Sequence, residues 1–182
     1  MEEIHLQYQT PIPVCQYMAD LLPAYVRSVF EPTSGQGNLK GVLKERGYGV
    51  TAPKDFFLFN AKFENTFDAV VMNPPFSEKS IIATNAPEGI DLKGMRGGYY
   101  ILNECMKRSN IVIALMPWFT ILDSDVRLRT MKEIGLVSVT ALPRKTFDYK
   151  RIQTCILELH KGYSGMIEFK TFDINLLKKK KK

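Results

Sequence analysis

The residues best suited to chemistry are Asn73-Pro74-Pro75-Phe76, which follow the apolar run 68–72. The side-chain carbonyl of Asn73 can accept a hydrogen bond from an amino group. The two prolines fix φ and lack N–H groups, so the turn is stiff and its carbonyls remain acceptors. The ring of Phe76 offers a surface on which a planar base can stack. These residue types suit methylation of an exocyclic amine on a planar base; the alternative is an ordinary proline-rich turn after a strand.

A second candidate segment is the loop 31–38, Glu31-Pro32-Thr33-Ser34-Gly35-Gln36-Gly37-Asn38. Two glycines after a strand let the backbone turn tightly and approach a ligand closely. The dinucleotide fingerprint Gly-x-Gly-x-x-Gly, counted from Gly35, requires glycine at position 40, where Lys40 stands. The loop therefore indicates a ligand site but disfavours a nicotinamide cofactor.

Helices and strands alternate along the chain that carries these loops. Strands are predicted at 28–31, 48–52, 68–72, 110–117, 136–142 and 152–160, with a last edge strand at 166–172. Helices are predicted at 14–22, 39–47, 99–107 and 124–134, whereas 56–59 is either strand or loop and 77–98 is a long mobile loop. This alternation predicts an α/β, doubly wound, mostly parallel sheet covered on both faces, with an antiparallel edge. The functional site should lie beyond the carboxyl ends of the strands.

Length and composition are those of one ordinary globular domain. The chain has 182 residues, of which 45% are hydrophobic and 24% charged. No stretch reaches the ~18 uninterrupted apolar residues of a membrane span. The acidic start Met-Glu-Glu-Ile-His lacks the charge pattern of a signal peptide, so we expect a cytoplasmic protein without a membrane partner.

Charge and cysteine content narrow the possible partners. Lys178–Lys182 supply five of the 25 basic residues, and the remaining 20 nearly balance the 19 acidic ones. The basic tail favours nucleic acid through counterion release, or is simply a solvated end. Cys15, Cys105 and Cys155 are widely spaced, and only two histidines occur, so neither a metal site nor a disulfide framework is predicted.

In their order along the chain, these segments resemble the motifs of the S-adenosylmethionine-dependent adenine-N6 DNA methyltransferase family in its gamma order. Asn73–Phe76 resembles motif IV, the loop 31–38 resembles motif I, and Thr10-Pro11 before a helix resembles motif X. Three later segments resemble the remaining catalytic motifs: 114–119, 142–147 and 154–160. The resemblance covers roughly residues 8 to 161.

The resemblance implies a Rossmann-like methyltransferase sheet, S-adenosylmethionine as cofactor and the N6 amine of adenine in DNA as methyl acceptor. It implies that Asn73 and the carbonyl of Pro74 hold the target amine, with Pro75 completing the turn and Phe76 stacking on an extruded base. The residues that it implies for the cofactor are Thr10, Pro11, Glu31, Pro32, Gly35, Gly37, Asp55 and Phe56. Asp55 and Phe56 resemble the motif that contacts the cofactor adenine.

Two departures from the family pattern keep other functions open. Thr51-Ala52-Pro53-Lys54 stands where an acidic residue normally holds the cofactor ribose. Residues 1–172 are interpreted as the catalytic domain and 173–182 as a basic tail, which leaves no separate target-recognition domain. We therefore expect DNA as partner, together with a specificity subunit or a homo-oligomer. The alternatives are an RNA or protein amino-methyltransferase, or a catalytically silent subunit that binds S-adenosylmethionine.

Overall fold

The computed structural model describes residues 9–62, 66–76, 85–147 and 152–177. Within these ranges seven strands form one sheet in the order β2-β1-β3-β4-β6-β5-β7. The strands are β1 Ser28–Phe30, β2 Gly49–Thr51, β3 Ala69–Met72, β4 Ile111–Pro117, β5 Leu136–Ala141, β6 Thr154–His160 and β7 Glu168–Thr171. The helices are α2 Ile12–Asp20, α3 Asn38–Glu45, α4 Phe56–Lys62, α5 Arg96–Arg108, α6 Phe119–Leu122, α7 Asp125–Ile134 and the 3-10 turn η2 Ile174–Leu177.

The sheet is parallel except for one reversed strand. β1 pairs in parallel with β2 and β3, and β3 pairs in parallel with β4. β6 runs antiparallel to both of its neighbours, β4 and β5, and β7 adds to β5 in parallel at the end of the sheet. The predicted α/β, mostly parallel sheet with an antiparallel edge is confirmed.

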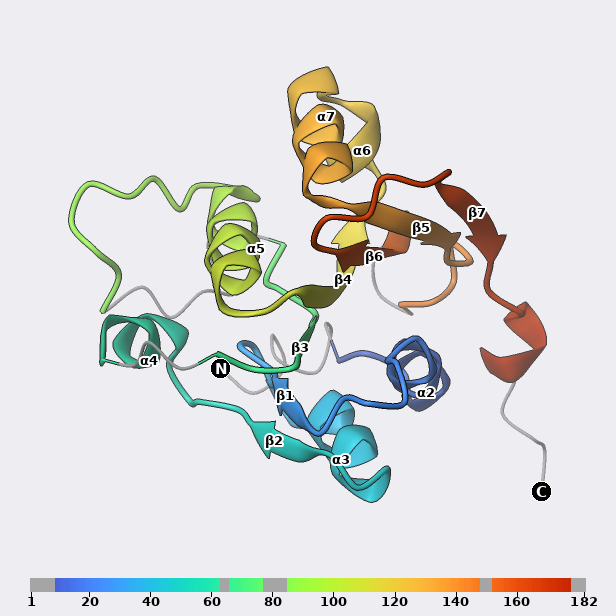
Figure 1. Cartoon of the computed structure of the whole chain (residues 1–182), viewed down its shortest axis with the longest axis horizontal. Helices are drawn as coiled ribbons and strands as arrows, with labels where there is room; N and C mark the ends of the chain where they lie inside the picture. The colour runs from blue at the N-terminus through green and yellow to red at the C-terminus, as the bar shows by residue number, and fades with distance from the viewer. Residues whose placement is uncertain (1–8, 63–65, 77–84, 148–151, 178–182) are drawn as a thin grey trace.

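Two apolar cores lie on opposite faces of the sheet because successive strand residues point to opposite sides. On one face α2 and α3 pack on the sheet, and Val29, Val71 and Ile113 point into that core. On the other face α4, α5 and α7 cover the sheet, and Val70 and Val112 point toward them. Figure 1 shows this division, with α2 and α3 on one side of the strands and α4, α5 and α7 on the other.

The structure differs from the sequence expectations in three places. The segment 56–59, expected as strand or loop, is helical and belongs to α4, whose start is capped by Asp55 through a 3.0 Å bond from the backbone N–H of Leu58. α5 begins at Arg96, so the last residues of the expected 77–98 loop are helical. The short helix α6 was not predicted. Residues 77–84 of the loop, and 178–182 of the basic tail, lie outside the described residues, but Leu177 in the tail packs against the α2–α3 core.

Candidate functional site

Thr10 joins the two loops that the sequence singled out. Asn73 Nδ2 donates to Thr10 Oγ1 at 3.0 Å, and Asn38 Nδ2 donates to the carbonyl of Thr10 at 3.0 Å. Thr33 Oγ1 donates to the carbonyl of Asn73, also at 3.0 Å. Because β1 and β3 are parallel neighbours, their carboxyl ends bring these loops to the same edge of the sheet. The structure therefore assembles Thr10, the glycine loop and the Asn-Pro-Pro turn into one site, which we call the Thr10 hub.

The glycine loop uses left-handed backbone at both glycines. Gly35 has φ +52° and Gly37 has φ +95°, a region that residues with a side chain rarely adopt. A Cβ on Gly37 would meet no atom of the described residues within 4 Å, whereas one on Gly35 would lie 2.5 Å from Gln9 Nε2. The loop thus keeps open space beside Gly37 and is covered by Gln9 at Gly35. Gly37 also caps α3, whose N–H groups begin at this point.

Glu31 is a buried carboxyl at the end of β1. Its side chain is 2% exposed, and its Oε2 has no hydrogen-bond partner among the described residues. Burial raises the pKa of Glu31 to about 7, and the positive charge of Lys40 offsets part of that rise. An unpartnered buried acceptor is costly unless a ligand donor or cation completes it. Glu31 is therefore built to receive a hydrogen-bond donor or a positive group.

The Asn-Pro-Pro turn rests on the first turn of α5. A Cβ on Gly98 would lie 2.9 Å from the carbonyl oxygen of Pro75 and 3.7 Å from Pro74 Cβ. Only glycine lets the helix approach the backbone of the turn this closely without displacing it. Sequence analysis missed Gly98; its only local signal is a glycine pair at the end of the expected loop. Phe76 is half-buried and packs against the α2–α3 core.

The residue after Gly98 ties α5 to the next helices. The guanidinium of Arg127 lies 4.4 Å from the ring centroid of Tyr99, and Arg127 Nε donates to the carbonyl of Thr120 at 3.1 Å. The hydroxyl of Tyr99 lies 3.4 Å from Thr120 Oγ1. Ser124 caps α7 by accepting a bond from the N–H of Arg127. The start of α5 is thus held between the Asn-Pro-Pro turn and the α6–α7 pair.

Asp55 and Phe56 take their partners from α4 and its flank. Burial acts to raise the pKa of Asp55, but hydrogen bonds from the N–H groups of Leu58 and Phe57 and from Asn85 Nδ2 hold the pKa below its ordinary value. Phe56 is 6% exposed and contributes to the core on the α4–α5 face. Asp55 therefore has a structural role as a helix cap, and contact of both residues with a cofactor stays a prediction.

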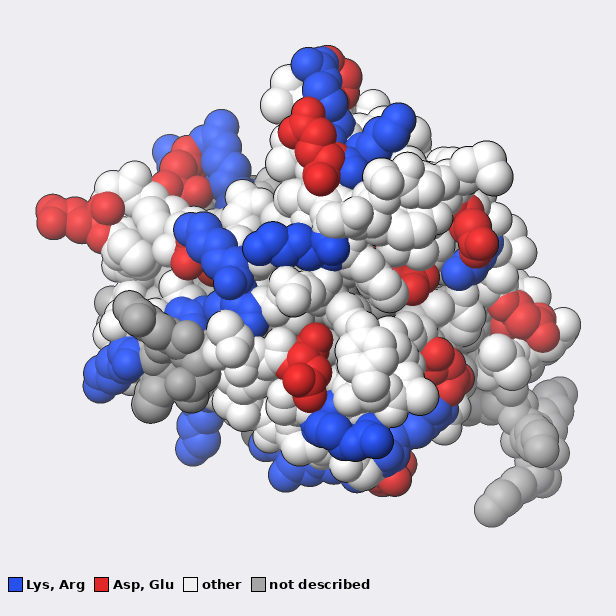
Figure 2. Space-filling model, in the orientation of Figure 1, with Lys and Arg blue, Asp and Glu red and all other residues white. Residues whose placement is uncertain are grey.

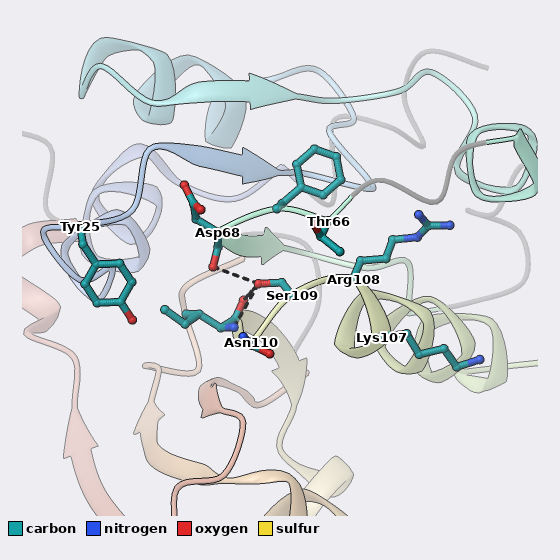
Figure 3. A pocket seen from close by; sticks show the side chains of 9 residues that line it. Tyr25, Thr66, Asp68, Lys107, Arg108, Ser109 and Asn110 are labelled. Atoms are coloured by element: carbon teal, nitrogen blue, oxygen red, sulfur yellow. Dashed lines mark hydrogen bonds between the residues drawn. The ribbon is translucent and has the colours of Figure 1, made fainter.

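A separate pocket of about 350 Å³ lies at the opposite edge of the sheet. Figure 3 shows Asp68 and Ser109 beside the amino ends of β3 and β4, with Lys107 and Arg108 from the end of α5. The carboxylate of Asp68 accepts the backbone N–H groups of Arg27 and Ser28 at 2.8 Å each, which ties β1 to β3. In Figure 2 acidic and basic side chains are interspersed over this face, with basic ones gathered beside α5. The pocket is remote from the Thr10 hub.

No helix in the ranges given above is long and apolar enough to cross a membrane. No three side chains of His, Cys, Asp or Glu come together there in a way that could hold a metal ion. All three cysteines are buried and unpaired, as expected for core residues.

No protein-family model and no curated protein sequence matches this chain. Solved structures do resemble it. A modification subunit of a type I restriction enzyme from Vibrio vulnificus is 18% identical with a TM-score of 0.62, covering 90% of this chain and 46% of that one. The type I restriction-modification methyltransferase subunit from Streptococcus thermophilus is 14% identical with a TM-score of 0.66, covering 91% and 47%.

A class I S-adenosylmethionine-dependent methyltransferase from Listeria monocytogenes is 13% identical with a TM-score of 0.65, covering 91% of this chain and 66% of that one. The chain spans about half the length of the two restriction-modification subunits. At these identities the similarity is one of fold: the chain has the fold of these methyltransferase subunits.

Proposed function

We propose that this chain transfers a methyl group from S-adenosylmethionine to the N6 amine of adenine in DNA. The observation that carries the proposal is the Thr10 hub, in which Asn73 Nδ2 and Asn38 Nδ2 both donate to Thr10. This hub places a glycine-loop ligand site and an amine-binding turn side by side at the carboxyl edge of a methyltransferase-like sheet. The proposal is also supported by the fold, which resembles that of a methyltransferase subunit and of an S-adenosylmethionine-dependent methyltransferase.

The cofactor fits the residues present. Glu31 has a buried oxygen to which no described residue donates, and this suits the ammonium of a bound amino acid moiety. The space beside Gly37 admits a ligand against the backbone. Thr10, Pro11, Pro32 and Gly35 complete the walls of this half of the proposed site. When bound, S-adenosylmethionine supplies an electrophilic methyl group.

The residues of the turn would prepare the acceptor amine. The bond from Asn73 Nδ2 to Thr10 fixes the orientation of the amide, and the bond from Thr33 fixes the backbone beside it. The side-chain carbonyl of Asn73 and the backbone carbonyl of Pro74 would accept the two amine hydrogens and so pull the nitrogen out of conjugation with the ring, which exposes its lone pair. The gain is one of positioning and desolvation, since Pro74 is buried and the prolines keep the turn stiff.

One observation favours a second candidate function. β2 ends in Thr51, and the following Ala52-Pro53-Lys54 has no carboxylate to hold the cofactor ribose. A catalytically silent subunit that keeps the fold is therefore the competing proposal, and an RNA or protein amine is the competing acceptor. In the first proposal a partner subunit would read the DNA sequence, as in assemblies with a specificity subunit.

Transfer of a labelled methyl group to DNA, RNA and protein acceptors, measured in parallel, tests the proposal. We expect label in DNA alone, recovered as N6-methyladenine. Calorimetry with S-adenosylmethionine should show one site that Gly37→Leu abolishes by filling the space beside the loop. Label in RNA or protein would move the proposal to those acceptors. Binding without transfer to any acceptor would favour the silent subunit, and unchanged binding in a folded Gly37→Leu variant would contradict the cofactor site.

A further inference from the structure

In the part of the chain that the structure describes, β7 is the last strand of the sheet, and no strand pairs with its outer side. It pairs with β5 in the parallel register that places Phe169 beside Val139. The N–H of Phe172 donates to the carbonyl of Ala141 at 3.0 Å, toward β5. Backbone groups of successive strand residues point to alternate sides, so positions 168 and 170 also point toward β5. The N–H and C=O of Phe169 therefore point to the outer side, where Figure 1 shows β7 at the margin of the sheet.

The side chains of β7 separate charge from apolar surface. Lys170 Nζ lies 3.2 Å from Glu168 Oε2 and 3.6 Å from Glu158 Oε2, so both β7 charges stand on the α2 face of the sheet. Phe169 stands on the other face and is 73% exposed. Proteins commonly protect an open edge with lysine. Here the ammonium of Lys170 is directed to two carboxylates on its own chain, so the edge keeps an exposed aromatic residue.

We propose that β7 pairs with β7 of a second copy of this chain, antiparallel and about a twofold axis through Phe169. In that register Glu168 stands opposite Lys170 of the other copy, and Lys170 stands opposite Glu168. The outward N–H and C=O of Phe169 exchange both hydrogen bonds with the same residue of the second copy, which is the hydrogen-bonded pair of an antiparallel ladder. A single twofold arrangement thus forms the backbone hydrogen bonds of Phe169 and both Glu168–Lys170 pairs.

The order Glu-Phe-Lys favours a second copy over another partner. Opposite charges directly across an antiparallel pair stabilise it and like charges destabilise it, so this triplet is its own complement. The twofold axis also buries Phe169 against its counterpart. Met166, which is 89% exposed, is carried toward η2 of the other copy, where Ile174 and Leu176 are 47% and 55% exposed. The exposed apolar side chains of Phe169 and Met166 are thereby both covered.

Sedimentation equilibrium of the full chain tests this surface independently of any methyl transfer. We expect a reversible dimer at about 100 μM or below. Phe169→Pro removes an outward N–H and leaves the β5–β7 bonds intact, so it should leave a monomer whose melting temperature is close to that of the parent. A parent chain that stays monomeric overturns the proposal. A dimer that survives Phe169→Pro overturns it as well.

A charge exchange tests the register. Glu168→Lys and Lys170→Glu each place like charges across the twofold axis, so each alone should associate at least roughly tenfold more weakly. An equimolar mixture of the two restores opposite charges at both positions, and we expect a mixed dimer in native mass spectrometry. Glu45→Lys on α3 makes the same change of net charge as Glu168→Lys and should leave dimerisation unchanged. Failure of the mixture to pair, with both variants folded, overturns the proposed register.

Discussion

Two buried glutamates, one in each half of the sheet, are in opposite situations. Glu158 on β6 is 7% exposed and is surrounded by partners: Ser138 Oγ donates to it at 2.6 Å, and Lys170 lies 3.6 Å away. His160 Nε2 lies 3.2 Å from its other oxygen, at ion-pair distance but outside hydrogen-bond geometry. Glu31, directly after β1, is also buried, but one of its oxygens has no hydrogen-bond partner among the described residues, and burial raises its pKa to about 7.

The two halves of the molecule differ in whether protein side chains satisfy the buried carboxyl group. In the antiparallel half, side chains of the protein itself surround the buried charge, so Glu158 belongs to the structure. In the parallel half, Glu31 lies at the carboxyl end of a strand beside the Thr10 hub, and no described residue donates a hydrogen bond to its Oε2. A buried acceptor that no described residue satisfies supports the proposed cofactor site, whereas the pocket of Figure 3 lies at the opposite edge of the sheet.

The largest expected effect is on turnover at the hub. Asn73→Ala removes an acceptor whose bond strengthens as the amine becomes pyramidal, so kcat should fall by roughly 10²–10³. The affinity for S-adenosylmethionine should change little, because the loop 31–37 keeps its own backbone. Single-turnover methylation with saturating cofactor measures this. A loss of cofactor affinity equal to the loss of kcat would show that Asn73 holds the two loops together and does not act on the amine.

The second largest expected effect is on stability and concerns the contrast between Glu31 and Glu158. The folded pKa of Glu31 is raised from an ordinary 4.5 to about 7, so its protonated form is favoured by folding, and stability falls as pH rises from about 4.5 to 7. Glu31→Gln removes this dependence and should raise the free energy of unfolding at pH 8 by about 3 kcal/mol, with little change at pH 5.

Glu158→Gln is the matched control for Glu31→Gln. It leaves Lys170 without one of its partners and should destabilise the protein by roughly 1–3 kcal/mol. Urea unfolding at the two pH values measures both variants without cofactor. If Glu31→Gln destabilises the protein at pH 8 as Glu158→Gln does, the contrast between the two carboxyls fails.

Local sequence signals sufficed for much of this molecule. The prolines of the Asn-Pro-Pro turn and the glycines of the loop 31–38 predict the backbone conformation at their own positions. The apolar runs predict the strands, including the edge strand β7. Relations between distant residues were harder to predict. The Thr10–Asn73 bond spans 63 positions and follows from the sheet order, while the approach of Gly98 to Pro75 depends on how α5 docks. The short run 56–59 was expected as strand or loop and is helical, because four consecutive apolar residues are too few to show a helical period.

Gly98 should show a smaller effect on turnover. In Gly98→Ala the new Cβ would lie 2.9 Å from the Pro75 carbonyl oxygen, so the turn must shift by a few tenths of an ångström. We expect kcat to fall by roughly tenfold with unchanged cofactor affinity, since small misplacements of reacting groups reduce rates. Helix propensity favours alanine by up to ~1 kcal/mol, so the protein should stay stable.

Gly49→Ala on β2 is the control for Gly98→Ala, because its Cβ would meet the Arg27 carbonyl oxygen at 3.5 Å, an ordinary contact. It should leave turnover at the parental value. Equal kcat in both variants would show that the contact between α5 and the turn does not position the reacting groups.

The smallest effect concerns the contact between the two halves, where Tyr99 of α5 meets Arg127 of α7. The guanidinium lies 4.4 Å from the ring centroid in a partly buried setting, and such cation–π pairs contribute about 0.5–1 kcal/mol. Arg127→Met also removes the hydrogen bond to the Thr120 carbonyl, so its change in the free energy of unfolding is larger than the contribution of the ring contact alone. A double-mutant cycle with Tyr99→Leu isolates the ring contact, and urea unfolding should give a coupling energy of about 0.5–1 kcal/mol. Additive changes would mean that α5 and α7 are not coupled through this pair. In that case the pairing of β4 with β6 would hold the two halves in register. Arg127→Met would then change neither the position of α5 nor the turnover.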